Sequence, residues 1–423
     1  MQSEPLLSTT LAEICKQQGG TIQTGPFGSQ LHASDYAATG TPVVMPADIV
    51  GGRVSTAAIA RVGSDHVERL SQHQLRFNDI IFSRRGDVTR FARVTEREVG
   101  WLCGTGCLKV RIGTGTIALP EWVAIALGAP EVKDWLVRHA IGATMPNLNT
   151  SILGAVPLKV PPIERQREAV EVCSALDDRI DLLRQTSATL ESIAQALFKS
   201  WFIDFDPVRA KAEGREPEGV DAATAALFPA GFEESALGLI PSGWNLARLG
   251  DLIELAYGKA LKATDRRPGS VPVYGSGGVT GYHDEALVKH PSIVVGRKGS
   301  VGTLYWEDAP FFPIDTTFYV KPKNAPLTFC FYAMQRLRLE NMNTDAAVPG
   351  LNRDNAYRLD LVRPERPALE AFDDLATPLR KTIRANALRA DALAQIRDTL
   401  LPRLISGKLR LPETQREIEE ALA

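Results

Sequence analysis

The 423-residue sequence predicts an α+β protein with two strand-rich domains, related by an internal repeat, and two long helices. Three observations support this prediction. A long amphipathic segment at 163–202 carries leucines every seven residues from Leu176 to Leu197, and a second such segment follows much later in the chain. The stretches that precede the two segments match each other. One unit, a globular part followed by a long helix, therefore occurs twice.

The first strand-rich domain is expected to cover residues 1–160. Short apolar runs bounded by Gly, Asp or Thr are typical of strands, and turn-forming residues from Thr21 to Ser29 predict a loop. The expected strands are 42–45, 80–82, 91–94 and 107–112, and the expected helices are 121–127 and 131–141.

The first long helix is expected over residues 161–205. Pro161 and Pro162 introduce it, because proline suits the first turn of a helix better than its interior. Its leucines recur every seven residues, and such a narrow apolar seam favours one partner helix. A long helix within an ordinary domain is the alternative. The expected seam residues are Leu176, Ile180, Leu183, Leu190 and Leu197.

The second half of the chain repeats this order. A Pro- and Gly-rich linker is expected at 206–243, with local packing through Leu227, Phe228, Phe232 and Leu237. A second strand-rich domain follows at 244–363, then a long helix at 364–412 and a tail at 413–423. The expected seam residues of this helix are Leu379, Ile383, Asn386, Leu393 and Leu400. A polar residue at a seam position, here Asn386, can fix helix register.

Two short segments occur in both halves. Met145-Pro-Asn-Leu-Asn149 parallels Val348-Pro-Gly-Leu-Asn352, and Ser83-Arg-Arg-Gly-Asp-Val-Thr89 parallels Gly296-Arg-Lys-Gly-Ser-Val-Gly302. Four polar residues in or directly after the first pair of segments could cap structure or touch bases, and capping is the favoured interpretation. These residues are Asn147, Asn149, Asn352 and Arg353.

Composition bounds the class of protein. We expect no membrane-spanning segment and no signal peptide, and the five cysteines suit a reducing cytoplasm. Cys103 and Cys107 could be zinc ligands, but buried thiols in a strand region are the preferred interpretation. The net charge of −2 argues only weakly against a nucleic-acid ligand, because residues 1–160 and 244–363 carry +2 and +3 while residues 161–243 carry −7.

Basic residues recur on glycine turns between expected strands. Glycine allows a backbone to approach phosphate closely, and the arginine fork can bind phosphate or guanine. A solvated hairpin tip is the alternative, and the duplication favours DNA contact. The candidate DNA-binding residues are Arg84, Arg85, Thr89, Arg90, Lys259, Lys262, Arg297, Lys298 and Ser300; Arg266 and Arg267 extend the Lys259 cluster.

Catalytic motifs are missing from the sequence. The segment 296–302 resembles a phosphate loop only loosely, since it lacks Gly-Lys-Ser/Thr and precedes an expected strand. We find no methyltransferase-like Asn/Asp-Pro-Pro-aromatic motif and no Ser/His/Asp or His-Glu-x-x-His pattern. We therefore expect no catalysis by the isolated chain and no metal.

The order of motifs resembles the specificity subunit of Type I restriction–modification enzymes. The resemblance rests on Met145–Asn149, Val156-Pro-Leu-Lys-Val-Pro-Pro-Ile-Glu-Arg-Gln166, Leu197-Phe-Lys-Ser-Trp-Phe-Ile-Asp-Phe205, Ile240-Pro-Ser-Gly-Trp244 and Leu400–Leu409. It covers nearly the whole chain. The second unit departs from it, because Pro364-Glu-Arg-Pro367 lacks the Glu-x-Gln of the first unit.

The resemblance implies a defence function against foreign DNA. Each strand-rich part would be a target recognition domain that binds one half of a split, asymmetric site on double-stranded DNA. The helices would pair as an antiparallel coiled coil that carries two modification subunits, with restriction subunits joining later. No cofactor is implied for this chain: S-adenosylmethionine would bind the modification subunit, and ATP and Mg would bind the restriction subunit. An enzyme of unrecognised type and a coiled-coil scaffold that binds protein are the rival hypotheses.

Overall fold

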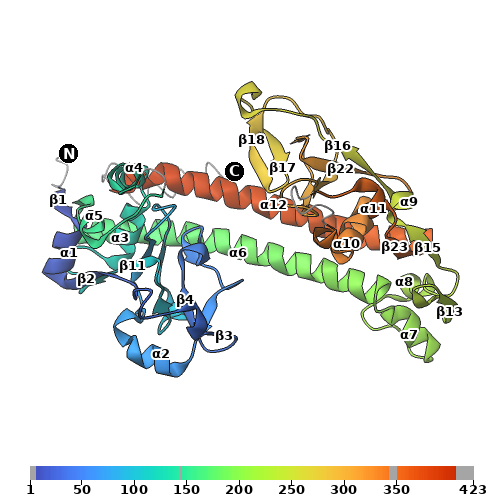
Figure 1. Cartoon of the computed structure of the whole chain (residues 1–423), viewed down its shortest axis with the longest axis horizontal. Helices are drawn as coiled ribbons and strands as arrows, with labels where there is room; N and C mark the ends of the chain where they lie inside the picture. Colours follow the sequence, from blue (N-terminus) through green and yellow to red (C-terminus); the bar gives the residue numbers. More distant parts are fainter. Residues whose placement is uncertain (1–5, 143–144, 343–349, 406–423) are drawn as a thin grey trace. The chain divides into compact units, whose positions relative to one another are not determined.

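The computed structural model describes residues 6–142, 145–342 and 350–405 (Figure 1). Val348 of the second repeated motif, the last residues of the expected second helix and the tail at 413–423 lie outside these ranges. The chain forms two compact units, one from residues 1–182 with 389–423 and one from residues 183–388. The long helices α6 (Ile163–Phe202) and α12 (Arg366–Ile405) therefore contribute to both units.

The main sheet of the first domain is antiparallel and has the strand order β2-β11-β8-β9. These strands are β2 (Gly19–Thr24), β8 (Ile80–Ser83), β9 (Phe91–Arg93) and β11 (Cys107–Gly113). A smaller sheet has the order β10-β4-β7-β3, formed by β3 (Tyr36–Ala37), β4 (Thr41–Val44), β7 (Ala60–Val62) and β10 (Leu102–Cys103). The central strand β8 is buried along its whole length, as a continuous apolar run predicts.

The second domain repeats this topology. Its main sheet has the order β16-β22-β19-β20, formed by β16 (Ile253–Tyr257), β19 (Ser292–Gly296), β20 (Leu304–Glu307) and β22 (Thr317–Pro322). Its smaller sheet has the order β18-β17-β21, formed by β17 (Val271–Gly275), β18 (Gly278–His283) and β21 (Phe312–Pro313). The equivalent pairs β4/β10 and β17/β21 are both parallel. The α+β class and the internal repeat are thus confirmed.

A two-stranded ribbon closes each domain before its long helix. β1 (Leu7–Thr10) pairs with β12 (Pro157–Val160), and β15 (Asn245–Arg248) pairs with β23 (Asp360–Arg363), both antiparallel. A helix follows the first ribbon strand in each domain, α1 (Leu11–Gln18) or α9 (Leu249–Leu252). Another helix precedes the second ribbon strand, α5 (Thr150–Gly154) or α11 (Arg353–Tyr357).

Within the described ranges, four further helices belong to the two domains. In the first domain these are α2 (Ser64–Arg69), α3 (Pro120–Leu127) and α4 (Pro130–His139), and in the second domain α10 (Leu327–Arg336). Of these, α3 and α10 pack against the main sheets. The expected loop at 21–29 is wrong in its first part, because β2 continues to Thr24. Pairing of β2 with β11 outweighs the local preference of its Gly and Thr residues for turns.

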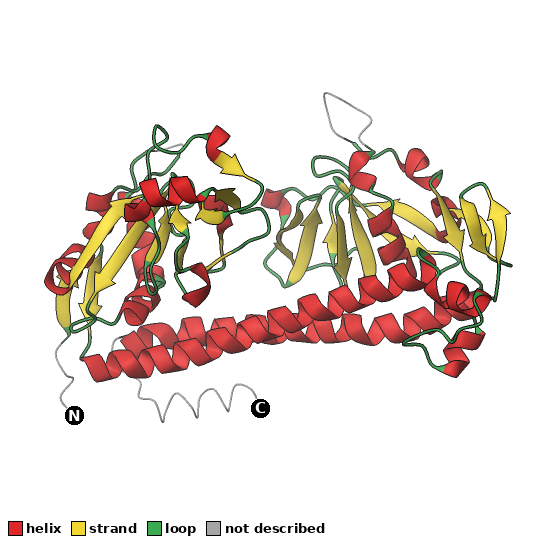
Figure 2. Cartoon of the chain, turned by 90° about the horizontal axis from the view of Figure 1, so that it is seen from below, coloured by secondary structure: helices red, strands yellow, loops and turns green. Residues whose placement is uncertain are grey.

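The long helices pair in the antiparallel sense, and Figures 1 and 2 both show them side by side. In the 183–388 unit, Glu191 of α6 lies 2.6 Å from Arg380 of α12, and Phe198 packs on Phe372 with ring centroids 5.7 Å apart. A higher number on α6 thus meets a lower number on α12. In the other unit, Asp177 binds Arg397 at 2.5 Å.

The heptad predicted the seam only in part. Six of the ten expected seam residues are buried: Leu176, Ile180, Leu183, Asn386, Leu393 and Leu400. Leu190, Leu197, Leu379 and Ile383 are half-buried. Large aromatic side chains replace the narrow seam in the 183–388 unit, where Phe198, Phe202 and Phe372 fill the space between the helices and the domain.

The segment expected as a linker contains regular structure. It forms α7 (Asp206–Ala212), α8 (Ala222–Ala226) and a hairpin of β13 (Phe232–Ser235) with β14 (Gly238–Pro241). Phe228 is buried against Trp201, with ring centroids 5.0 Å apart, and Leu227 and Phe232 pack on the same core. The predicted packing of Leu237 is wrong, since this side chain is 51% exposed.

Candidate nucleic-acid interface

The two basic turns have the same backbone. Each turn joins two strands of a main sheet, β8 to β9 in the first domain and β19 to β20 in the second. Gly86 and Gly299 occupy the same position and have φ angles of 77° and 80°, which favour glycine. Two residues further on, Val88 and Val301 are buried and anchor the turns to the domain. We call residues 84–90 the first basic turn and residues 297–303 the second basic turn.

Each basic turn is held by the leucine of the repeated Pro-x-Leu-Asn motif. The Leu148 N–H donates to the Arg84 carbonyl at 2.8 Å, and the Leu351 N–H donates to the Arg297 carbonyl at the same distance. Both leucine side chains are buried, so each leucine is anchored in its domain. The two sequence repeats therefore belong to one structural feature in each domain.

The next residue of that segment caps a helix. Asn149 Oδ1 accepts from the Ile152 N–H at 2.8 Å, and Asn352 Oδ1 accepts from the N–H groups of Asp354 and Asn355 at 2.9 and 3.1 Å. The capping interpretation is confirmed for both asparagines. Asn147 and Arg353 do not cap: Asn147 forms a backbone bridge with Arg85, and the Arg353 side chain packs on tyrosine rings.

The first basic turn presents two of its four candidate residues. Arg85 is exposed, and the half-buried Arg84 has an Nε atom without a hydrogen-bond partner in the described part of the chain. Thr89 and Arg90 instead bind Asp87: Thr89 Oγ1 donates to Asp87 Oδ1 at 2.6 Å, and Arg90 Nε donates to Oδ2 at 3.1 Å. The Thr89 hydroxyl, with further help from Arg90, lowers the pKa of the Asp87 carboxyl.

The second basic turn has no carboxylate of its own. Lys298 and Ser300 are exposed, and Ser300 stands where the first turn has Asp87. Arg297 Nη1 donates to the Asp315 carbonyl at 3.0 Å, and its guanidinium carbon lies 4.9 Å from the Tyr257 ring centroid. Arg297 is thus oriented, whereas the exposed Lys298 side chain makes no ion pair with any other described residue.

The Lys259 cluster divides into two kinds of residue. Arg267 binds Asp284 and Glu285 at 2.7 and 3.2 Å, and Arg266 donates to the Thr280 carbonyl at 2.7 Å. Lys259 and Lys262 are exposed and pair with no carboxylate among the described residues. These two lysines are the part of the cluster that remains available to an anion.

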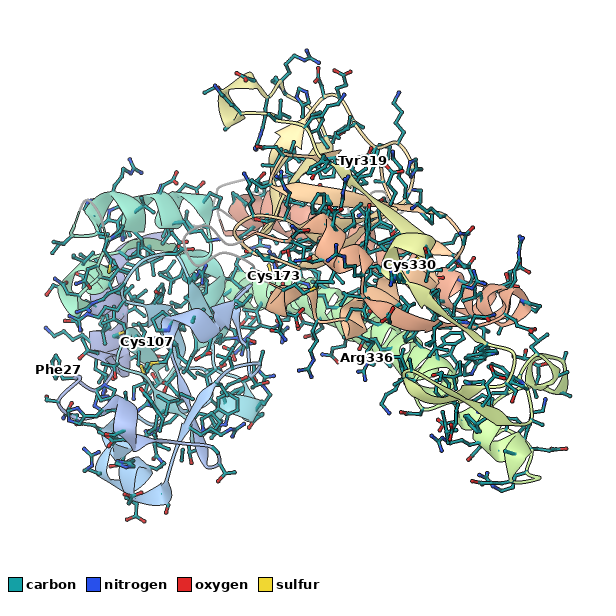
Figure 3. The ribbon with its side chains drawn as sticks, turned by 45° about the vertical axis from the view of Figure 1, so that its right-hand side comes forward. Phe27, Cys107, Cys173, Tyr319, Cys330 and Arg336 are labelled. Atoms are coloured by element: carbon teal, nitrogen blue, oxygen red, sulfur yellow. The ribbon has the colours of Figure 1, made fainter. Side chains whose placement is uncertain are left out.

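The cluster and the second basic turn meet on one segment. The Lys259 N–H donates to the Pro313 carbonyl at 3.1 Å, and the N–H groups of Arg297 and Lys298 donate to the Thr316 carbonyl at 2.9 and 3.1 Å. Residues 313–316 therefore bring together basic residues that are about 40 positions apart in sequence. In the first domain, Arg84 and Arg85 lie at the same edge of the main sheet as the loop that follows β2. This loop carries Phe27, which is 59% exposed (labelled in Figure 3). Phe27 was not among the residues predicted from the sequence, although it lies in a Gly-Pro-Phe-Gly turn.

The cysteines are buried thiols. Cys103 ends β10 and Cys107 begins β11, and burial raises the pKa of Cys103 to about 12. Within the described ranges, no group of three or more His, Cys, Asp or Glu side chains is arranged to hold a metal ion. None of the helices so described combines the length and the apolar character that crossing a bilayer requires.

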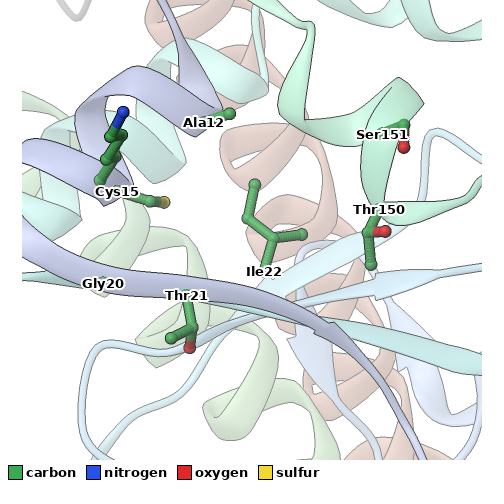
Figure 4. Close-up of a pocket in the computed structure, with 8 residues that line it drawn as sticks. Ala12, Cys15, Gly20, Thr21, Ile22, Thr150 and Ser151 are labelled. Atoms are coloured by element: carbon green, nitrogen blue, oxygen red, sulfur yellow. The ribbon is translucent and has the colours of Figure 1, made fainter.

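One open pocket of about 360 Å³ lies in the first domain, between α1, β2 and α5 (Figure 4). Its lining consists of Ala12, Cys15, Lys16, Gly20, Thr21, Ile22, Thr150 and Ser151. The second domain fills the equivalent place with Tyr357, whose hydroxyl accepts a hydrogen bond from the Leu255 N–H at 2.8 Å. The pocket has no cluster of catalytic side chains.

Comparison with known proteins gives a consistent result. The family model described as Type I restriction modification DNA specificity domain matches residues 11–192 and 241–365. The chain is 24% identical over 362 residues to the Type I restriction enzyme HindI specificity subunit of Haemophilus influenzae, with 69% of this chain and 78% of that protein covered.

One further sequence match and one solved structure agree with this result, the latter in fold. The Type I restriction enzyme MjaIX specificity subunit of Methanocaldococcus jannaschii is 25% identical over 324 residues, with 69% and 70% of the two chains covered. The crystal structure of a Type I restriction–modification S subunit from M. genitalium superposes with a TM-score of 0.54 and 16% identity, over 96% of this chain and 97% of that chain.

Proposed function

Because the chain belongs to the Type I restriction–modification DNA specificity family, we propose that each of its strand-rich domains binds one half of a split DNA target. The chain is the specificity subunit of such a system and recognises the DNA target. One domain, residues 1–160, would bind one half-site, and the other domain, residues 244–363, would bind the second.

The duplicated basic turn carries this proposal. Arg84 and Arg297 begin turns of equal backbone geometry, and each is followed by an exposed basic residue, Arg85 or Lys298. Basic side chains on a rigid turn can bind phosphates or base edges in a groove. We assign the strongest contacts to Arg84, Arg85, Arg297 and Lys298, with Lys259 and Lys262 as phosphate contacts. Thr89 and Arg90 are weaker candidates because Asp87 engages them.

The paired helices suit a platform for other subunits. Exposed apolar residues lie on both helices, among them Leu182, Ile193 and Leu388. We propose that two modification subunits dock along α6 and α12 and that restriction subunits join afterwards. The chain itself would bind double-stranded DNA in the cytoplasm without a cofactor, while S-adenosylmethionine would bind the modification subunit.

Domain exchange tests the assignment of half-sites. The chain is co-expressed with its modification subunit, and the methylated genomic motif is determined. Replacing residues 1–160 with the equivalent part of a relative should alter one half of the motif and leave the other unchanged. A change in both halves would refute separate recognition by the two domains.

Single arginines test the basic turns. Arg84→Ala and Arg297→Ala should each cost about 1–3 kcal/mol of DNA binding if the arginine contacts a base, and each should relax only one half-site. A phosphate contact would instead weaken binding to every sequence and lower the salt slope by about one. Arg138→Ala on α4 is the control in the first domain. If the variants bind DNA as tightly as this control, the basic turns are solvated hairpin tips that do not contact DNA.

Purification tests the absence of catalysis. The isolated chain should transfer no methyl group from S-adenosylmethionine to DNA, and adding the modification subunit should start transfer. Methylation by the chain alone would show that it is an enzyme in its own right.

A further inference from the structure

Two arginines of the second domain share one exposed aromatic ring. The guanidinium carbon of Arg297 lies 4.9 Å from the centroid of the Tyr257 ring, and that of Arg353 lies 5.2 Å from the same centroid. The Tyr257 side chain is 49% exposed, although it ends a strand of the main sheet. We call Arg297, Tyr257 and Arg353 the stacked cluster.

Further rings fix both guanidinium groups. Arg297 also lies 5.7 Å from the Phe318 ring centroid, and Arg353 lies 5.8 Å from the Tyr357 ring centroid. Phe318 in turn packs against Tyr257, with ring centroids 4.9 Å apart. Each arginine is therefore oriented by two rings before any ligand binds. This arrangement reduces the side-chain entropy that binding would otherwise cost.

The positive charge of the cluster is poorly balanced within the described residues. The one ion pair that either arginine makes there joins Arg353 Nε to Asp354 Oδ1 at 3.9 Å, at the limit for such a contact. Arg353 Nε is buried and lacks a hydrogen-bond partner among these residues. Two guanidinium groups beside one ring repel each other, and an approaching polyanion relieves this repulsion.

The first domain has no such cluster. Gly25 and Gly258 occupy equivalent positions, because each follows a strand and its N–H donates to the carbonyl of the first residue of the neighbouring strand, at 2.9 and 3.1 Å. Thr24, directly before Gly25, therefore corresponds to Tyr257. Thr150 stands at the position of Arg353, directly after the capping asparagine. The duplicated frame therefore does not require these side chains, and the stacked cluster is particular to the second domain.

We propose that Arg353 is a DNA contact of the second recognition domain and that Tyr257 is a positioning residue that orients Arg297 and Arg353 toward the duplex. This inference rests on the proposed function. The planar arginine fork binds guanine or phosphate in a bidentate manner, so its orientation decides whether both hydrogen bonds form. A ring that fixes two forks would sharpen recognition of the second half-site only.

The test uses the complex of the full chain with its modification subunits and a duplex that carries its methylated motif. Arg353→Gln should weaken binding about 10- to 100-fold. Tyr257→Leu should weaken it about 3- to 10-fold through the lost cation–π contacts, whereas Tyr257→Phe keeps the ring and should bind like the unaltered complex. Arg336→Gln on α10 (labelled in Figure 3) is the matched control, with the same charge change in the same domain.

A double-mutant comparison separates positioning from direct contact. In an Arg297→Ala, Arg353→Gln background, Tyr257→Leu should cause no further loss, because the ring then has no guanidinium to orient. A further loss would show that the ring itself touches DNA, and the positioning role would be overturned. Arg353→Lys, which keeps the charge and removes the fork, should retain the salt dependence and lose discrimination at the second half-site.

Other outcomes are equally decisive. Equal affinities for Arg353→Gln and Arg336→Gln would overturn Arg353 as a contact, and melting temperatures show whether each variant is folded. Failure of the proposed function would look different, because the unaltered complex would then show no sequence preference at all.

Discussion

The two recognition domains share a backbone and differ in the side chains around it. Their basic turns have the same φ at glycine, the same buried valine and the same leucine N–H contact. The first turn carries Asp87, whereas the second has Ser300 in that place and adds aromatic rings under Arg297. The backbone of the basic turns is therefore the same in both domains, while the side chains that decide what each turn binds differ.

The domains also hold their long helices by different chemistry. In the first domain, Gln166 of α6 is fully buried; its Oε1 accepts from the Leu119 N–H, and its Nε2 donates to the carbonyls of Ile117 and Pro161, all at 2.8 Å. The ribbon register places Leu369 at this position in the second domain, where it joins an apolar core with Phe372. A polar clamp in one copy thus corresponds to aromatic packing in the other.

Removing an aromatic side chain from the core of the 183–388 unit should cause the largest loss of stability. Phe372→Ala should lower the free energy of unfolding by about 3–5 kcal/mol, because Phe372 is completely buried among Phe198, Phe202 and Tyr332. Denaturant unfolding of the full chain measures the loss. Leu375→Ala on the same helix is the control, since Leu375 is 47% exposed. Equal losses for both variants would contradict the aromatic core as the anchor.

A slightly smaller effect should follow from removing the polar clamp. Gln166→Leu copies the residue of the second domain but leaves one buried N–H and two carbonyl groups without their partner. We expect a cost of about 2–4 kcal/mol. The reverse exchange, Leu369→Gln, should also destabilise the chain, because it buries an amide in an apolar core. If either exchange left the free energy of unfolding unchanged, the polar and the apolar residue would be interchangeable at this position, contrary to the difference described above.

A third prediction concerns a complementary pair of small and large residues. In the second domain, a Cβ atom on Gly250 would lie 2.9 Å from the Cβ of Tyr357; in the first domain, the corresponding residues are Ala12 and Gly154. Gly250→Ala should therefore cost about 1–3 kcal/mol through overpacking. In a Tyr357→Gly background the same substitution should cost nothing or stabilise the chain, as alanine favours the helix. An equal loss of stability in both backgrounds would show that residues 250 and 357 are not coupled.

The smallest expected effect is a change in DNA binding when Asp87 of the first basic turn is replaced. Asp87→Ser gives the first basic turn the residue of the second turn and releases Arg90 from its ion pair. Binding to the target duplex should strengthen about 2- to 5-fold, because an exposed ion pair is worth less than 1 kcal/mol. Asp134→Ser on α4 removes the same charge elsewhere in the domain and serves as control. Weaker binding with an intact fold would show that Asp87 itself contacts DNA or shapes the turn.

The sequence predicted what depends on repetition and on spacing. Heptads predicted both helices, and the paired Gly-containing segments predicted turns that the structure places in equivalent positions. Prediction failed where distant residues decide. Strand pairing extended β2 into an expected loop, and the expected seam residues Leu379 and Ile383 are only half-buried where aromatic side chains fill the core. Tyr257 and Arg353 are nearly 100 residues apart, so no local pattern connects them.

The division of the chain has a consequence for its synthesis. The 183–388 unit is one continuous segment, so all its described contacts can form once residue 388 has left the ribosome. The other unit needs residues 389–405, whose Ala390, Leu393 and Leu400 are buried there. Until those residues are made, the part of α6 in this unit, residues 163–182, lacks the helix that covers its buried apolar side chains. The helix contacts of the unit that begins the chain can therefore be completed only after those of the 183–388 unit.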